Sequence, residues 1–106
     1  MYGLIGRLVA VPGQRDALSH ILLAGTQQMA GCISYVVAAD PNDEDALWIT
    51  EIWDSQESHD KSLSLPAVQQ AIAAGKPLIA CFSKRFETVP LGGHGLVSPQ
   101  VPAHCG

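Results

Sequence analysis

The chain has few charged side chains, and very few of them are basic. Of its 106 residues, 15% are charged and only six are lysine or arginine, which leaves a formal net charge of −4. Globular domains average about 25% charged residues. Because no basic stripe is available to neutralise phosphates, we expect no nucleic-acid partner.

Long apolar runs and a disulfide framework are also missing. No segment approaches the ~20 apolar residues of a membrane span, and the first residues lack the pattern of a secretory signal. We therefore expect no membrane partner. The three cysteines, Cys32, Cys81 and Cys105, are widely spaced and odd in number. They indicate reduced residues in a cytoplasmic protein, and neither disulfides nor a zinc site.

The chain is instead rich in hydrophobic residues, at 47%, and these follow two kinds of period. Helical spacing predicts one helix over 14–30 and a second helical stretch from residue 54 to about 74. Apolar, β-branched segments indicate four strands, at residues 3–11, 32–39, 46–53 and 78–89.

Two residues are expected to end or interrupt the predicted helices. Gly31 stands where the C-terminal cap of the first helix belongs. Pro66 interrupts the second stretch, and we expect a kink or a break into two short helices there, because proline removes a backbone donor and clashes with the preceding turn.

The element order β-α-β-β-α-β predicts an α+β, ferredoxin-like domain over residues 1–89. Both helices should cover one face of a four-stranded antiparallel sheet. Residues 90–106 hold many glycines and prolines and are expected to form a tail, or an arm that reaches a partner subunit. His94, His104 and Cys105 in this tail lack the spacing of a metal site, so we expect no bound metal.

The predicted strands are apolar on both sides. In the third strand, Trp53 shares a side with Glu51, while Trp48 and Ile52 share the other. The helices can cover only one face, and an uncovered apolar face is typical of an interface. We therefore predict a two-fold homodimer whose sheets pack face to face.

Several stretches, in this order, resemble the antibiotic biosynthesis monooxygenase family, and in particular its quinol monooxygenase-like members. A first strand runs into "VPGQRDAL", "GCISYVV" follows the first helix, "WITEIWDSQE" leads into the second, and "SLP" comes next. The resemblance covers about residues 3–89. It implies a dimeric α+β barrel in which two ferredoxin-like halves close sheet on sheet.

The resemblance also implies an activity, namely oxidation of a phenolic or quinol-type aromatic substrate by O₂ without a cofactor. An electron-rich substrate can act as its own reductant once its hydroxyl loses a proton. A phenol has a pKa of about 10, so little of it is ionised at neutral pH. The protein must therefore supply a base, an oxyanion partner and an apolar cavity.

The chain departs from the family at one position. The family pattern places a histidine nine residues after the tryptophan of its Glu-x-Trp motif, and that position here is Ser62. The nearest histidine is His59, six residues after Trp53. Residues three apart lie on adjacent parts of one helix face, so His59 is the candidate substitute.

His59 is accordingly the candidate catalytic base, with a solvated helix residue as the alternative. Glu51 is a carboxylate on an otherwise apolar strand, so it needs a partner of opposite charge. Arg7 and Arg85 lie on other predicted strands, and we expect one of them to form a cross-strand ion pair with Glu51. The candidate substrate-binding residues, each with a purely structural alternative, are Trp48, Trp53, Tyr35, Arg85 and Glu51.

Three functions remain open on the sequence. The first is a cofactor-independent oxygenase, and the second is a non-catalytic dimeric small-molecule-binding or accessory protein of the same fold. The third is a haem-degrading enzyme, which would need a histidine ligand on the second helix, and His59 is offset from that position. An apolar cavity of ~300 Å³ or more, with a titratable group pointing inward, would favour catalysis or small-molecule binding.

Overall fold

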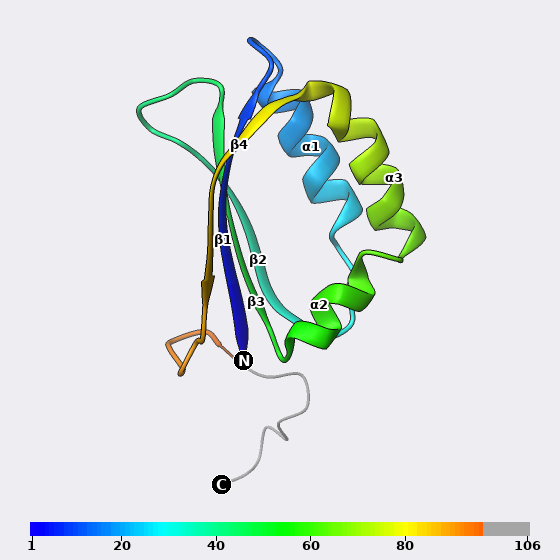
Figure 1. Cartoon of the computed structure of the whole chain (residues 1–106), viewed down its shortest axis with the longest axis vertical. Coiled ribbons are helices and arrows are strands. Elements are labelled where there is room, and N and C mark those ends of the chain that lie inside the picture. Colours follow the sequence, from blue (N-terminus) through cyan, green and yellow to red (C-terminus); the bar gives the residue numbers. More distant parts are fainter. Residues whose placement is uncertain (97–106) are drawn as a thin grey trace, which may run out of the picture.

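A four-stranded antiparallel sheet with helices on one side forms the computed structural model, which describes residues 1–96 (Figure 1). The strand order is β2-β3-β1-β4. This arrangement confirms the predicted ferredoxin-like α+β fold, while the dimeric barrel stays a prediction. The strands are β1 (Tyr2–Ala10), β2 (Cys32–Ala39), β3 (Ala46–Trp53) and β4 (Ile79–Thr88), and the helices are α1 (Arg15–Gly25), α2 (Gln56–Ser62) and α3 (Pro66–Gly75).

The predicted break at Pro66 is confirmed. Helix α2 ends at Ser62 and α3 begins at Pro66 itself, where the missing N–H of proline leaves no helical hydrogen bond unmade. A 3₁₀ turn, η1 (Lys76–Leu78), then leads into β4. Figure 1 shows α1 and α3 side by side over the sheet, with the short α2 at one end.

The predicted end of the first helix is wrong. Helix α1 stops at Gly25, and Gly31 does not cap it. Gly25 lies so close to α3 that a Cβ atom there would meet the Ala71 side chain, so the two helices cross at this glycine. The Thr26 hydroxyl then donates a hydrogen bond to the carbonyl of Leu22, 2.6 Å away, at the end of the helix.

Gly31 instead forms the turn that enters β2. Its φ of +83° lies in the left-handed region that favours glycine. Its carbonyl accepts a hydrogen bond from the Asp54 N–H at 2.9 Å, which ties this turn to the end of β3. The turn therefore fixes the start of β2 beside the start of α2.

The hydrophobic core fills only part of the space between sheet and helices. Its centre is a buried cluster of Leu8, Ala10, Leu18 and Leu47, contributed by β1, α1 and β3. Leu18 has no exposed surface at all. Beyond this cluster the space between the two layers remains open, and it holds the candidate site described below.

The sheet face opposite the helices carries an apolar row that is uncovered in the single chain. Val36 is opposite Thr50, Thr50 is opposite Ile5, and Ile5 is opposite Phe86, so these four residues form a row across all four strands. Val36 and Phe86 are 51% and 52% exposed. Among residues 1–96, no helix is long and apolar enough to cross a membrane.

The turn at Gly31 yields a test of this packing. A Cβ atom at position 31 would lie 2.5 Å from the Ser58 hydroxyl oxygen and 2.8 Å from Asp54 Oδ1. We predict that Gly31→Ala lowers the free energy of unfolding by about 2–4 kcal/mol, measured by urea titration.

Gly13→Ala is the matched control, because Gly13 has a φ of +82° but no atom within 4 Å of the added Cβ. It should cost about 1 kcal/mol, from the backbone conformation alone. Equal losses for the two variants would contradict the close packing of Gly31 against α2.

Candidate functional site

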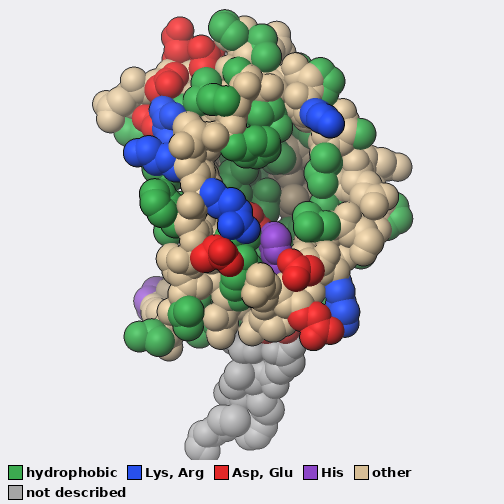
Figure 2. All heavy atoms as spheres, in the orientation of Figure 1, with side chains coloured by type: hydrophobic (Ala, Val, Ile, Leu, Met, Phe, Trp, Pro, Cys, Tyr) green, Lys and Arg blue, Asp and Glu red, His purple; other side chains and the backbone are tan. Residues whose placement is uncertain are grey.

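A cavity of about 670 Å³ lies between the inner face of the sheet and the helices. Figure 2 shows it as a hollow in the molecular surface with hydrophobic side chains on its walls. Its volume exceeds the ~300 Å³ that a small aromatic ligand needs. The apolar wall comes from every layer of the fold, with Leu8, Leu22, Ile49, Val68, Ile72 and Phe82 among its residues.

Among the residues that the structure describes, Glu51 is the one acidic residue on the cavity wall. The alternation of β3 turns Ile49, Glu51 and Trp53 toward the helices. The indole N–H of Trp53 donates a hydrogen bond to Glu51 Oε1 at 3.0 Å, and the carboxylate side chain is only 18% exposed. Burial raises the pKa of Glu51, while the Trp53 N–H, His59 and Arg85 act in the opposite direction.

His59, on α2, lies beside Glu51. The hydroxyl of Ser55 caps this helix by accepting a hydrogen bond from the Ser58 N–H at 3.1 Å. The His59 ring then packs edge-on against Trp53, with 5.4 Å between ring centroids, and its side chain is 15% exposed. His59 is therefore not a solvated surface residue.

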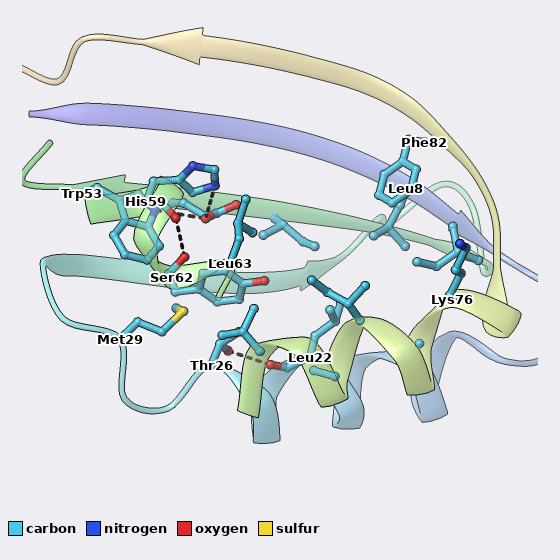
Figure 3. Close-up of a pocket in the computed structure, with 18 of the residues that line it drawn as sticks. Leu8, Leu22, Thr26, Met29, Trp53, His59, Ser62, Leu63, Lys76 and Phe82 are labelled. Atoms are coloured by element: carbon cyan, nitrogen blue, oxygen red, sulfur yellow. Dashed lines mark hydrogen bonds and ion pairs between the residues drawn. The ribbon is translucent and has the colours of Figure 1, made fainter. Parts of the chain in front are cut away.

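The two ring nitrogens of His59 face different carboxylates. Nε2 is 3.9 Å from Glu51 Oε1, and Nδ1 is 3.3 Å from Asp60 Oδ1 at the exposed side. Figure 3 shows the His59 ring and the Trp53 ring at the same end of the cavity. Glu51 and His59 thus form a pair of proton-accepting groups in an otherwise apolar wall.

Tyr35 adds a hydroxyl to the same end of the cavity. It stands directly opposite Glu51 in the β2–β3 register and lines the cavity. Burial raises the pKa of its phenol above the ordinary value, and the charges of Glu51 and Cys32 add to this effect. Within residues 1–96 the hydroxyl has no protein hydrogen-bond partner, so it is available to donate to a ligand.

Arg85 borders a smaller cavity of about 240 Å³, which shares Glu51, His59 and Phe82 with the main one. Its guanidinium Nη1 is 3.5 Å from Glu87 Oε1. Arg85 influences Glu51 only through its charge, which lowers the pKa of that carboxylate. Among the described residues no ion pair joins the two within 4.0 Å, so the predicted cross-strand pair with Arg85 is wrong.

Arg7 does not pair with Glu51 either. It lies on the opposite sheet face, where its Nε is 3.0 Å from Asp40 Oδ2 and its Nη2 is 3.1 Å from Asp43 Oδ2. Trp48 is on that face too, and its indole N–H donates to Asp40 Oδ2 at 2.9 Å. Hydrogen bonds from the backbone N–H of Asn42 and from the side chains of Arg7 and Trp48 lower the pKa of Asp40 to about 2.

The predicted site residues therefore separate into two groups. The structure brings Tyr35, Glu51, Trp53 and His59 together on one cavity wall, with Arg85 in the adjoining cavity. It places Trp48 on the other side of the sheet, away from both. The separation of Trp48 from Trp53 follows the strand alternation that the sequence predicts.

Ser62, at the position of the expected family histidine, also lines the main cavity. It is 5% exposed, and its hydroxyl donates to the carbonyl of His59 at 2.6 Å. His59 and Ser62 thus occupy adjacent positions on the face of α2 that borders the cavity, as their spacing predicts, while the substitution of His59 for the family histidine stays a prediction.

Sequence reasoning missed the residues that line the rest of the cavity. Met29 lies in the connection that replaces the predicted end of the first helix, and Lys76 and Phe82 lie where α3 passes into β4. None of them belongs to a motif. The spacing of apolar residues in the first predicted helix places Leu22 and Met29 on one face, but it does not indicate that they border a cavity.

The raised pKa of Glu51 gives a prediction with a definite sign. A raised pKa means that the native state holds the proton more tightly than the unfolded chain, so the contribution of Glu51 to wild-type stability falls as pH rises from 4.5 through the raised pKa. Glu51→Gln has no such titration and still offers Trp53 an acceptor. Its stability relative to wild type should therefore rise with pH over this window, measured by urea unfolding between about pH 4 and pH 7.

Glu57→Gln is the control for this comparison. Glu57 pairs with Lys61 at 3.0 Å on the surface of α2, and its side chain is 76% exposed. Its stability relative to wild type should not rise with pH. A rise of similar size in both variants, or none in Glu51→Gln, would contradict the assignment of the shift to burial of Glu51.

The geometry can be compared with known proteins. The sequence profile of the antibiotic biosynthesis monooxygenases matches residues 1–74. A solved structure from Chloroflexus aurantiacus, provisionally named as such a monooxygenase, is 64% identical, with a TM-score of 0.89 over 91% of this chain and 98% of its own. No curated protein matches the chain.

Two further solved structures agree with the fold. A Deinococcus radiodurans protein with the same provisional name is 31% identical, with a TM-score of 0.72 over 88% of this chain and 95% of its own. Rv0793 from Mycobacterium tuberculosis is 24% identical, with a TM-score of 0.72 over 88% of this chain and 97% of its own. At this identity it supports the fold alone. By its sequence match over residues 1–74 and these relatives, the chain belongs to the antibiotic biosynthesis monooxygenase family.

Proposed function

We propose that this protein is a cofactor-independent monooxygenase that oxidises a phenolic or quinol-type small molecule with O₂. The observation that carries the proposal is the pair of Glu51 and His59 on the wall of an apolar cavity of about 670 Å³. Membership of the family supports the reaction class. We place the protein in the cytoplasm, in keeping with its free Cys32 and Cys81.

The proposed reaction needs only proton transfer and an electron-rich ring. Removing the phenolic proton concentrates negative charge on the ring and makes transfer of electrons to O₂ easier. When a methylene group of the substrate becomes a carbonyl, one oxygen atom enters the product and the other leaves as water. The substrate supplies every electron in this reaction, so the protein supplies position and proton transfer.

Each predicted site residue in the two cavities has a role in this proposal. The pair of Glu51 and His59 takes the phenolic proton, and a protonated His59 then stabilises the phenolate. The Tyr35 hydroxyl donates a hydrogen bond to the substrate, and Trp53 holds Glu51 in place through its indole N–H. Arg85, in the adjoining cavity, provides a positive charge beside the developing anion.

We further propose that two copies pack through their uncovered sheet faces. The row of Val36, Thr50, Ile5 and Phe86 leaves apolar side chains in solvent in the single chain. Burying such a surface contributes roughly 25 cal/mol for each Å² of apolar area. A dimer would also leave the cavities on the outer sides of the two sheets, where a ligand can reach them.

A second function is favoured by one observation. Ser62 stands at the position of the family histidine, and its hydroxyl is bonded to a backbone carbonyl instead of facing a ligand. A protein that binds a small aromatic molecule without oxidising it would keep the cavity and tolerate this change. Such a protein would be a dimeric binding or accessory protein of the same fold.

Oxygen uptake over a panel of quinols and anthrones tests the catalytic proposal. We expect turnover by the wild type, and a loss of about 10²-fold or more in His59→Ala and in Glu51→Gln, which is the usual contribution of a general base. His20→Ala is the control, because His20 is exposed on α1 and lines none of the cavities described above. Its rate should equal that of the wild type.

Two results would contradict this proposal. No turnover above background on any substrate, combined with tight binding of the same compounds, would favour the binding protein. Equal rates for wild type and His59→Ala would remove His59 from the mechanism.

Light scattering coupled to size-exclusion chromatography tests the dimer. We expect a dimer at micromolar concentration, and a monomer when Phe86→Glu or Val36→Glu places a charge on the uncovered face. Leu23→Glu is the control, because Leu23 is 41% exposed on α1 and should leave the dimer intact. A stable wild-type monomer would contradict the proposed interface.

A further inference from the structure

The main cavity has polar groups at two separate ends. Glu51 and His59 lie at one end, beside Trp53. Lys76 lies at the other, near Leu8 and Phe82, as Figure 3 shows. Apart from these three groups, Tyr35 and Cys81 are the only ionisable side chains within residues 1–96 that line the cavity. The wall between the two ends is largely apolar.

Lys76 differs from the other cations of the chain in having no protein partner. Arg7 is held by two aspartates, and Lys61 and Arg85 each lie within 3.5 Å of a glutamate oxygen. The guanidinium of Arg15 donates to backbone carbonyls, and Lys84 lies over the Trp48 ring. Among residues 1–96, Lys76 alone of these cations forms no ion pair, no side-chain hydrogen bond and no cation–π contact.

The surroundings of Lys76 are apolar and open to solvent. Ile72 and Phe82, which are 50% and 74% exposed, line the same cavity. Lys76 is thus a cation at the accessible part of an apolar cavity, where an anionic group on a bound ring would meet it.

The overall charge of the protein makes a local cation important. With a formal net charge of −4, the molecule as a whole repels anions, and Glu51 adds a carboxylate inside the cavity. An anionic ligand would therefore need a nearby positive charge to bind. Arg85 does not supply this charge at the other end of the main cavity, because it borders the adjoining cavity beside Glu51 and His59.

We propose that Lys76 binds an anionic substituent, such as a carboxylate or sulfonate, at the far end of an elongated multi-ring aromatic ligand. The other end of the ligand would then reach Glu51 and His59, and this part rests on the function proposed above. Lys76 acts as a specificity-determining residue for ligand charge, with no part in proton transfer. A cavity of about 670 Å³ has room for more than one aromatic ring.

The alternative to ligand binding by Lys76 is a structural role. It directly follows α3, and a cation at the C-terminal end of a helix is favoured by the helix dipole. That role depends on the charge of Lys76 but not on the charge of a ligand. A comparison of charged and uncharged ligands with the same rings therefore separates the two roles.

Fluorescence titration with two dyes makes this comparison. The dye 8-anilinonaphthalene-1-sulfonate carries a sulfonate, and N-phenyl-1-naphthylamine has the same rings without it. We expect Lys76→Gln to weaken binding of the sulfonate dye by about threefold to tenfold and to leave binding of the neutral dye unchanged. Lys76→Arg should bind both dyes as the wild type does.

Lys61→Gln is the control, because it removes one positive charge from the surface of α2, outside the main cavity. It should change neither affinity, which would exclude a general effect of net charge. Circular dichroism of each variant checks that the fold is retained.

Three results would overturn the proposal. They are equal weakening of both dyes by Lys76→Gln, no change for either dye, or equal weakening of the sulfonate dye by Lys61→Gln. Because the assay measures binding alone, it can succeed when no oxygen is consumed. Failure of the catalytic proposal is thus distinguishable from failure of this one.

Discussion

The burial of one carboxylate, Glu51, against an apolar wall is the constraint on which the rest of the site depends. A buried charge is costly unless it is paired or hydrogen-bonded. Here the indole N–H of Trp53 and the nearby ring of His59 supply that compensation. Strand β3 provides the first partner and the capped helix α2 the second, so the site exists only where these two elements meet.

The cavity itself follows from how the helices are held. The break between α2 and α3 lets α2 turn across the end of the sheet, while α3 continues beside α1. The contact of Gly25 with Ala71 fixes the crossing of α1 and α3 over the core. Because the buried cluster around Leu18 fills only part of the interior, the remaining volume extends from Glu51 and His59, beside α2, along α3 to Lys76.

Strand and helix periods were enough to predict the sheet and the separation of Trp48 from Trp53, and the chemistry of proline was enough to predict the break at Pro66. These features depend on local residue patterns. The end of α1 was not predictable in this way, because it depends on a contact between Gly25 and a residue of α3 far along the chain. The partners of Arg7 and the position of Lys76 were missed for the same reason: each depends on how distant elements pack. His104 and Cys105 and most of the predicted tail lie outside the described residues, so the division at residue 89 stays a prediction.

The ionisation state of a bound phenol tests the central claim most directly. A chromogenic nitrophenol absorbs at different wavelengths as neutral phenol and as phenolate, so its state in the cavity can be read without any turnover. The pair of Glu51 and His59 should shift the bound compound toward phenolate at a pH where the free compound is mostly neutral. The shift should disappear in the double variant Glu51→Gln, His59→Ala. A bound phenol that stays neutral in the wild type, or that ionises equally in the double variant, would contradict the account.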